Sequence, residues 1–191
     1  MKTFILSLAP VLLSATISAQ GVFSNKTQSI LEKVIQDYPN HFYNIKGDLI
    51  GQTHQAAEYR STLQLPGSSS CTITLYSASH TAGYDWTCAV YEAGSFEQAS
   101  AHFREIYEQI GNSIITTNHR KTYILTGQFE NPSEDRKLTH IVFALLPGVE
   151  EVKKLKVELS LVQDESRKWK ILLSVNDQDS KSVMQSDLTA N

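Results

Sequence analysis

Two cysteines, Cys71 and Cys88, are the residues whose chemistry the sequence specifies best. Cys71 begins the alternating run Cys-Thr-Ile-Thr-Leu-Tyr, and Cys88 lies in the run Tyr-Asp-Trp-Thr-Cys-Ala-Val. Alternation of this kind is typical of half-buried strands. Antiparallel pairing with Cys71 opposite Cys88 also places Ile73 opposite Trp86 on the same face. Because a single register satisfies both the apolar face and the geometry of a disulfide, we predict that the two cysteines are bonded.

The six histidines show no spacing that indicates a metal or catalytic site. None belongs to an HExxH sequence or to a Cys/His cluster with the spacing of metal ligands. His80 lies between the cysteines, and Asp85, beside Tyr84, is an acid inside an apolar run. A secreted hydrolase with an unrecognised site near His80 and Asp85 is therefore the alternative that stays open. The disulfide uses both thiols, so we assign no catalytic, cofactor-binding or metal-binding residue.

The charge pattern argues against a nucleic-acid partner. The chain has 17 basic and 20 acidic residues, a net charge of −3, and no basic run. Domains that bind DNA or RNA concentrate positive charge on one surface, which this sequence does not. The nine glycines are spread singly, so no phosphate-binding loop is predicted either.

Residues 1–19 have the order of a secretory signal peptide. One lysine precedes an apolar run, and small residues then lead to Ala19. The apolar run fades by Ser14 and is too short to span a bilayer, and no cysteine follows it as in a bacterial lipoprotein. We predict a secreted or periplasmic protein that has no membrane span after the signal peptide is removed. An exported location agrees with a disulfide.

The first half of the remaining chain predicts one helix and four strands. The helix begins at Asn25 or Thr27, carries one apolar stripe and ends before Pro39. The strands are expected at residues 42–50, 59–65, 71–76 and 84–90. The second of them ends at a Leu-Pro-Gly sequence, which is typical of a turn.

The second half repeats this order. Ser95 begins a helix, with Gln98 in position for a capping box, and Gly111 ends it. Four more strands are predicted at 122–129, 137–146, 154–162 and 168–175, and we expect the last two to pair with Leu161 opposite Trp169. Residues 177–191 are polar and aperiodic, and they predict a C-terminal tail.

These elements predict an α+β fold with two helices packed on an antiparallel sheet, as a single domain over residues 20–176. The halves 20–93 and 94–176 would then be tandem, pseudo-duplicated αββββ units, each with Leu-Pro-Gly after its second strand. Coincidence is the alternative, because Leu-Pro-Gly is a common strand ending and the helices and turns are offset by different lengths.

The strands of the second half have a second apolar face, which a sheet covered by one helix does not need. It consists of Val142, Ala144, Leu146, Val162 and Leu172, which alternate with the residues expected to meet a helix. Strands that are apolar on both sides either lie inside a two-layer core or form a contact surface. We therefore predict a non-enzymatic binding module that uses this sheet face for a protein partner, a ligand or a second copy of the chain.

The exported protein should begin at Gln20, because signal peptidases cleave after small residues such as those that end at Ala19. Intact-mass measurement of the exported protein checks this prediction. A soluble exported form that retains residues 1–19 would contradict it.

Overall fold

The computed structural model describes residues 20–77, 82–117, 120–149 and 152–177. The predicted signal peptide, His80 and residues 178–191 of the predicted tail lie outside these ranges. The elements in chain order are α1 (Gln20–Asp37), η1 (Tyr38–Asn40), η2 (Tyr43–Ile45), β1 (Lys46–Gln52), β2 (Ala56–Ser61), β3 (Ser70–Ser77), β4 (Ala82–Ala93), α2 (Phe96–Ile110), β5 (Ile114–Thr116), β6 (Thr122–Thr126), β7 (Leu138–Leu146), β8 (Leu155–Gln163) and β9 (Trp169–Asp177).

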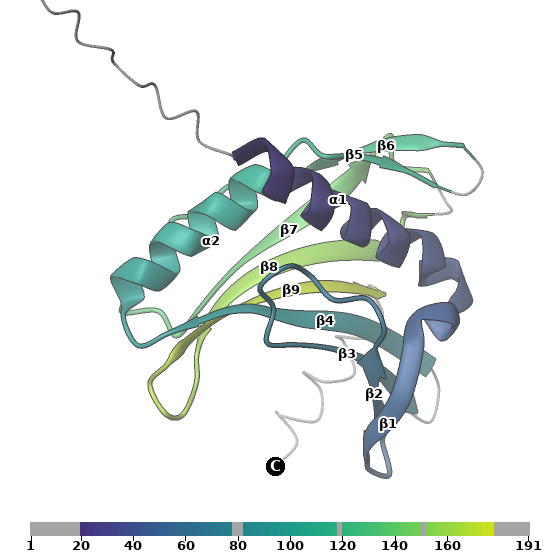
Figure 1. Ribbon diagram of the computed structural model, residues 1–191, viewed down its shortest axis with the longest axis horizontal. Coiled ribbons are helices and arrows are strands. Elements are labelled where there is room, and N and C mark those ends of the chain that lie inside the picture. Colours follow the sequence, from purple (N-terminus) through teal and green to yellow (C-terminus); the bar gives the residue numbers. More distant parts are fainter. Residues whose placement is uncertain (1–19, 78–81, 118–119, 150–151, 178–191) are drawn as a thin grey trace, which may run out of the picture.

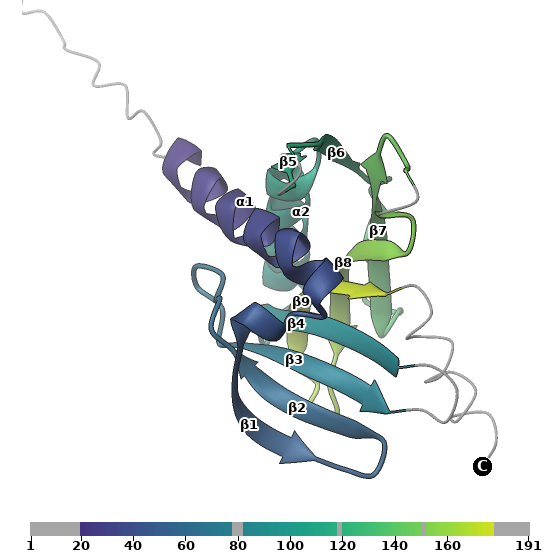
Figure 2. The ribbon, with the colours of Figure 1, turned by 90° about the vertical axis from the view of Figure 1, so that its right-hand side faces the viewer.

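The strands form one antiparallel sheet in the order β1-β2-β3-β4-β9-β8-β7-β6-β5. Strands β1 to β4 are a meander, α2 leads to the opposite edge, and β5 to β9 return as a second meander. The sheet curves around α1 and α2, which both lie on its concave side (Figures 1 and 2). The predicted α+β class, with two helices on an antiparallel sheet, is confirmed.

The hairpin of β3 and β4 has the predicted register. Cys71 is bonded to Cys88 and lies opposite it, with a Cα–Cα distance of 4.0 Å, and Ile73 lies opposite Trp86. All four side chains are buried on the concave face under the helices. The indole N–H of Trp86 donates to the hydroxyl of Ser61 at 2.9 Å, so the one polar atom of this large side chain is satisfied inside the core.

Helix α2 also begins and ends where predicted. The hydroxyl oxygen of Ser95 accepts from the backbone N–H of Gln98 at 3.5 Å, and the N–H of Gly111 donates to the carbonyl of Tyr107 at 2.7 Å. Helix α1 is longer than predicted, because it begins at Gln20, and it ends at Asp37, just before Pro39 as expected.

Two strands of the first half differ from their predicted ranges. Residues 42–45 are not a strand, because His41 and Phe42 both have left-handed backbone angles (φ 55° and 59°) and a short helical turn follows. This reversal buries Phe42 completely beneath the end of α1. Strand β2 ends at Ser61, and Leu65 instead lies buried in the loop that leads to β3.

The second half differs from the prediction in the register of one strand pair and in having one additional strand. Leu161 lies opposite Ile171, and Gln163 lies opposite Trp169, so the β8–β9 pairing is shifted by two residues from the prediction. The turn keeps its length but lies one residue further along the chain, and within it the Asp164 carboxylate accepts from the N–H of Lys168 at 2.9 Å. A two-residue shift keeps each side chain on its face. Strand β5 was not predicted.

The edge strand β5 is protected by side chains of α1. The amides of Gln28 and Gln36 donate to the carbonyls of Ile114 and Thr116 at 2.8 and 2.6 Å. The Glu32 carboxylate accepts from the N–H of Thr116 at 2.9 Å. Positions four residues apart share one side of a helix, so these three side chains occupy the hydrogen-bonding positions of a further strand.

Reduction of the Cys71–Cys88 bond should lower the free energy of unfolding by about 3 kcal/mol, because the bond closes a loop of this length in the unfolded chain. Urea unfolding with and without reductant measures the effect, with the Cys71→Ala/Cys88→Ala variant as the control that reductant should leave unchanged. Two free thiols in the native, unreduced protein would contradict the prediction.

Candidate functional site

The predicted contact residues all lie on the convex face of the sheet, which is turned away from both helices. Along β7 exposed and buried positions alternate strictly, and Val142, Ala144 and Leu146 occupy the exposed set. Val162 and Leu172 lie on the same face of β8 and β9, where they are half-buried. The structure therefore brings the five residues to one face but leaves only those of β7 open to solvent.

Apolar side chains that the sequence analysis did not single out extend this face. Ile114 on β5 lies opposite Ile124 on β6, which in turn lies opposite Leu146 on β7. Leu138 is exposed at the other end of β7. The alternation Thr-Tyr-Ile-Leu-Thr in β6 is the signal that could have identified Ile124, because its neighbours Tyr123 and Leu125 fill the core.

We call Ile114, Ile124, Leu138, Val142 and Leu146 the apolar patch. Each keeps between 40% and 54% of its surface exposed. Five aliphatic residues at this exposure present on the order of 400 Å² to water in total, which is within the range of the largest apolar patch on a typical monomer, and such patches are often functional. On β7 the exposed His140 lies between Leu138 and Val142. At about 25 cal/mol per Å², covering the patch is favourable by on the order of 10 kcal/mol before the costs of association.

The structure places two residues near the alternative hydrolase site, Tyr84 and Asp85, on opposite faces of the sheet. Asp85 lies half-buried on the convex face, where its carboxylate accepts from the hydroxyl of Thr87 at 3.1 Å. The neighbouring Tyr84 points to the concave side and contacts the rings of Tyr38 and His41. His80 lies outside the described residues. Tyr84 and Asp85 therefore point to opposite faces and cannot converge on one substrate.

A cluster of aromatic side chains at the end of α1 has a structural role. The hydroxyl of Tyr38 donates to the Asp177 carboxylate at 3.0 Å and so ties the helix end to the end of β9. Burial, followed by the neighbouring Tyr84 and the negative charge of Asp177, raises the pKa of Tyr38 far above its usual value. Burial also raises the pKa of Tyr84. Both phenols therefore stay neutral at physiological pH.

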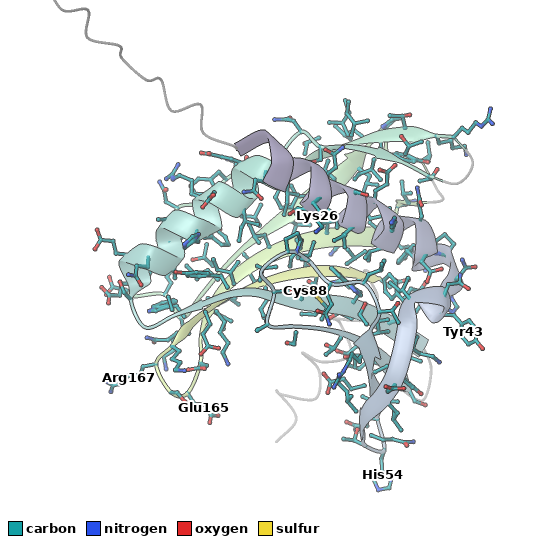
Figure 3. All side chains as sticks on the ribbon, viewed as in Figure 1. Lys26, Tyr43, His54, Cys88, Glu165 and Arg167 are labelled. Atoms are coloured by element: carbon teal, nitrogen blue, oxygen red, sulfur yellow. A yellow bond between two sulfur atoms is a disulfide. The ribbon has the colours of Figure 1, made fainter. Side chains whose placement is uncertain are left out.

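The histidines that the structure describes do not gather in one place. Figure 3 shows His54 at the tip of the β1–β2 hairpin, far from the helices. On α2, His102 lies with Nδ1 3.2 Å from a Glu105 carboxylate oxygen and stacks on Tyr91. His140 lies on the exposed side of β7. No group of three or more His, Cys, Asp or Glu in the described ranges is placed to hold a metal ion.

Charged side chains at the β8–β9 hairpin form surface ion pairs. Figure 3 shows Glu165 and Arg167 at the hairpin tip, directed away from the molecule. Lys168 pairs with Glu92 at 2.8 Å, and Lys170 pairs with Asp164 at 3.0 Å. Hydrogen bonds from Lys168 and Lys170 lower the pKa values of the Glu92 and Asp164 carboxyls, respectively. These exposed pairs favour the observed turn, which borders an open hollow of about 500 Å³ lined by Lys137, Gln163, Asp164, Glu165 and Arg167.

A hollow of about 260 Å³ lies on the helix side of the sheet. It is bounded by α2, by the Leu65–Gly67 turn and by Val90 and Tyr91 at an irregularity in β4. Of the side chains that line this hollow, His102 is the one that could take part in the most kinds of reaction. It is already paired with Glu105 and lies against the ring of Tyr91. The apolar patch is therefore the stronger candidate site.

Comparison of the chain with protein-family models, with curated proteins and with solved structures finds no match. Within the part of the chain that the structure describes, no helix has the length and apolar character needed to cross a membrane. Function is therefore inferred from the geometry of the convex face.

Replacing Tyr38 with Phe should lower the free energy of unfolding by about 1 kcal/mol at pH 7, because the bond to Asp177 is lost. An unfolded tyrosine ionises near pH 10, whereas the pKa of folded Tyr38 is raised, so the wild-type protein loses stability as the pH rises above about 10. Phenylalanine cannot ionise, so the difference between the two proteins should shrink at pH 11.

Urea unfolding at pH 7, 9 and 11 measures this difference. The control is Tyr43→Phe, since the Tyr43 side chain is exposed and the change should leave stability unaltered. A difference that stays constant or grows with pH would show that Tyr38 is not held neutral.

Proposed function

We propose that this protein is an exported, non-enzymatic binding protein that associates, through the apolar patch, with the same patch of a second copy. The observation that carries the proposal is the row Ile114–Ile124–Leu146, which runs across three strands on the face that neither helix covers. Aliphatic side chains placed side by side in water favour any contact that removes them from it.

A second copy suits this surface because the patch has no charge of its own. Two identical uncharged surfaces related by a two-fold axis bury the same residues on both sides without opposing like charges. A partner chosen by charge would need complementary charged groups, which Ile, Leu and Val do not supply. The apolar patch is also a sheet surface rather than a pocket, and this favours a protein surface over a small molecule.

The size of the patch indicates a weak dimer. A standard interface buries about 800 Å² on each partner, about twice what the apolar patch alone provides. Neighbouring polar side chains of the same face, such as Thr122 and Ser160, would contribute the rest. We therefore expect a dissociation constant in the micromolar range.

The disulfide and the signal-peptide order of residues 1–19 support the exported location in this proposal. Oxidising compartments are where such bonds persist, and a small exported protein gains stability from one. Secretion and a periplasmic location are equally compatible with these two features.

We also propose that the two halves of the chain arose by duplication. Each half consists of a helix followed by a meander, and the last strands of the two meanders, β4 and β9, pair antiparallel at the centre of the sheet. This arrangement has the topology of two units related by a two-fold axis between β4 and β9. Strand β5 is the element without a counterpart in the first half of the described chain.

Replacing Ile124 with Glu should convert the dimer to a monomer, because it places a carboxylate in the middle of the apolar row. Ile124 is half-exposed, so we expect a native circular dichroism spectrum and at least about a tenfold rise in the dissociation constant, or about 1.4 kcal/mol. Sedimentation equilibrium over a range of concentrations measures this.

The matched control is Leu49→Glu, which changes an equally exposed aliphatic residue on β1, at the other edge of the sheet. This variant should dimerise like the wild-type protein. A wild-type chain that stays monomeric at 0.1 mM, or an Ile124→Glu variant that dimerises normally, would overturn the proposal.

A further inference from the structure

The hollow on the helix side of the sheet is lined by segments that lie far apart in the chain. Four residues on one side of α2 line it, namely His102, Glu105, Ile106 and Gln109. Thr27 of α1 adds to this side. Another side is the Leu65-Pro66-Gly67 turn, in a loop that rises from the sheet on the side of the helices (Figure 2). The Leu-Pro-Gly sequence that the sequence analysis singled out therefore forms part of a binding-sized hollow.

An irregularity in β4 shapes the floor of the hollow. Ala89 lies opposite Leu172 and Tyr91 lies opposite Ile171, so β4 has one more residue than β9 in this stretch, Val90. In a regular strand successive side chains point to opposite faces, whereas a bulge re-aims one of them. Both Val90 and Tyr91 line the hollow as a result. Bulges are frequent next to active sites, where they serve this purpose.

The interior of the hollow is apolar and large enough for a small molecule. Leu65 and Leu173 are buried at its base, and Val90 and Ile106 are half-buried. An apolar cavity of about 150 Å³ holds one benzene ring, and this hollow has about 260 Å³. It therefore has room for two fused rings. The ring of Tyr91 offers them an aromatic surface to pack against.

The charge at the hollow favours a cationic ligand. Among the described residues that line it, Glu105 alone carries a fixed charge, and none is Lys or Arg. Its carboxylate is 60% exposed, and Oε2 lies 3.2 Å from Nδ1 of His102. A carboxylate accepts several hydrogen bonds, so Glu105 can accept from an ammonium group and keep its contact with His102. An anionic ligand would instead be repelled by Glu105.

We infer that this hollow binds a small aromatic amine. The aromatic rings lie against Val90, Tyr91 and Ile106, and the ammonium group lies at the Glu105 carboxylate. The inference does not depend on the proposed dimer, because the hollow lies on the helix side of the sheet and the apolar patch lies on the convex face.

The test uses tryptamine, an indole ring with a two-carbon chain that ends in an amine. Isothermal titration of the intact protein should give a dissociation constant on the order of 0.1 mM. Indole-3-propionate has the same ring on a two-carbon chain that ends in a carboxylate, and it should bind about fivefold more weakly or less. Butylamine, which has the charge without the ring, should show no saturation.

Two further measurements test the position of the ligand. Nuclear Overhauser effects should connect the indole protons of tryptamine with the methyl groups of Val90 and Ile106. Glu105→Gln should weaken tryptamine binding several-fold and remove the preference for the amine over the carboxylate. Because Glu105 is exposed, this variant should keep a native circular dichroism spectrum. The matched control is Glu165→Gln, which makes the same change at the second hollow, at the tip of the β8–β9 hairpin, and should leave binding unaltered.

Four results would overturn the inference. These are no saturable binding of tryptamine up to about 1 mM, equal or tighter binding of indole-3-propionate, contacts of the indole ring with other residues only, and an unchanged preference for the amine in Glu105→Gln. None of them bears on the dimer, whose test is the sedimentation of the Ile124→Glu variant.

Discussion

Two helices are too few to cover both faces of a nine-stranded sheet, and most features of this molecule follow from that constraint. The sheet curves around α1 and α2 and buries its aromatic and aliphatic side chains on the concave side. Neither helix covers the convex side. It is polar in its central strands and apolar at the β5–β7 end, where the residues of the apolar patch stay 40–54% exposed.

The pairing of β4 with β9 joins the two meanders into one sheet. On its concave side Trp86 lies opposite Val175 and the disulfide-bonded Cys88 lies opposite Leu173, all completely buried. At the far edge, α1 satisfies the free backbone groups of β5 through Gln28, Glu32 and Gln36. The helix α1 therefore protects the edge that adjoins the apolar patch and disfavours edge-to-edge pairing there.

Local sequence features correctly predicted those parts of the structure that depend on local interactions. The capped helix after Ser95, the Cys71–Cys88 register and the alternation of β7 each depend on residues close in the chain. The left-handed turn at Phe42 and the short strand β5 depend on contacts with distant elements, so no local pattern indicated them. The β8–β9 register was missed because a two-residue shift leaves the same side chains on each face. The burial of Asn176 was hidden for a related reason, since alternation assigns a residue to a face but does not give its exposure.

Methyl contacts between copies test the central claim most directly. In a dimer of one isotope-labelled and one unlabelled chain, filtered NMR spectra detect contacts between methyl groups of different copies only. Association through the apolar patch predicts contacts from the methyl groups of Ile124 in one copy to apolar-patch residues such as Leu146 or Val142 in the other. A dimer whose contacts between copies lie elsewhere, or methyl shifts of Ile124 that do not change on dilution, would contradict the claim.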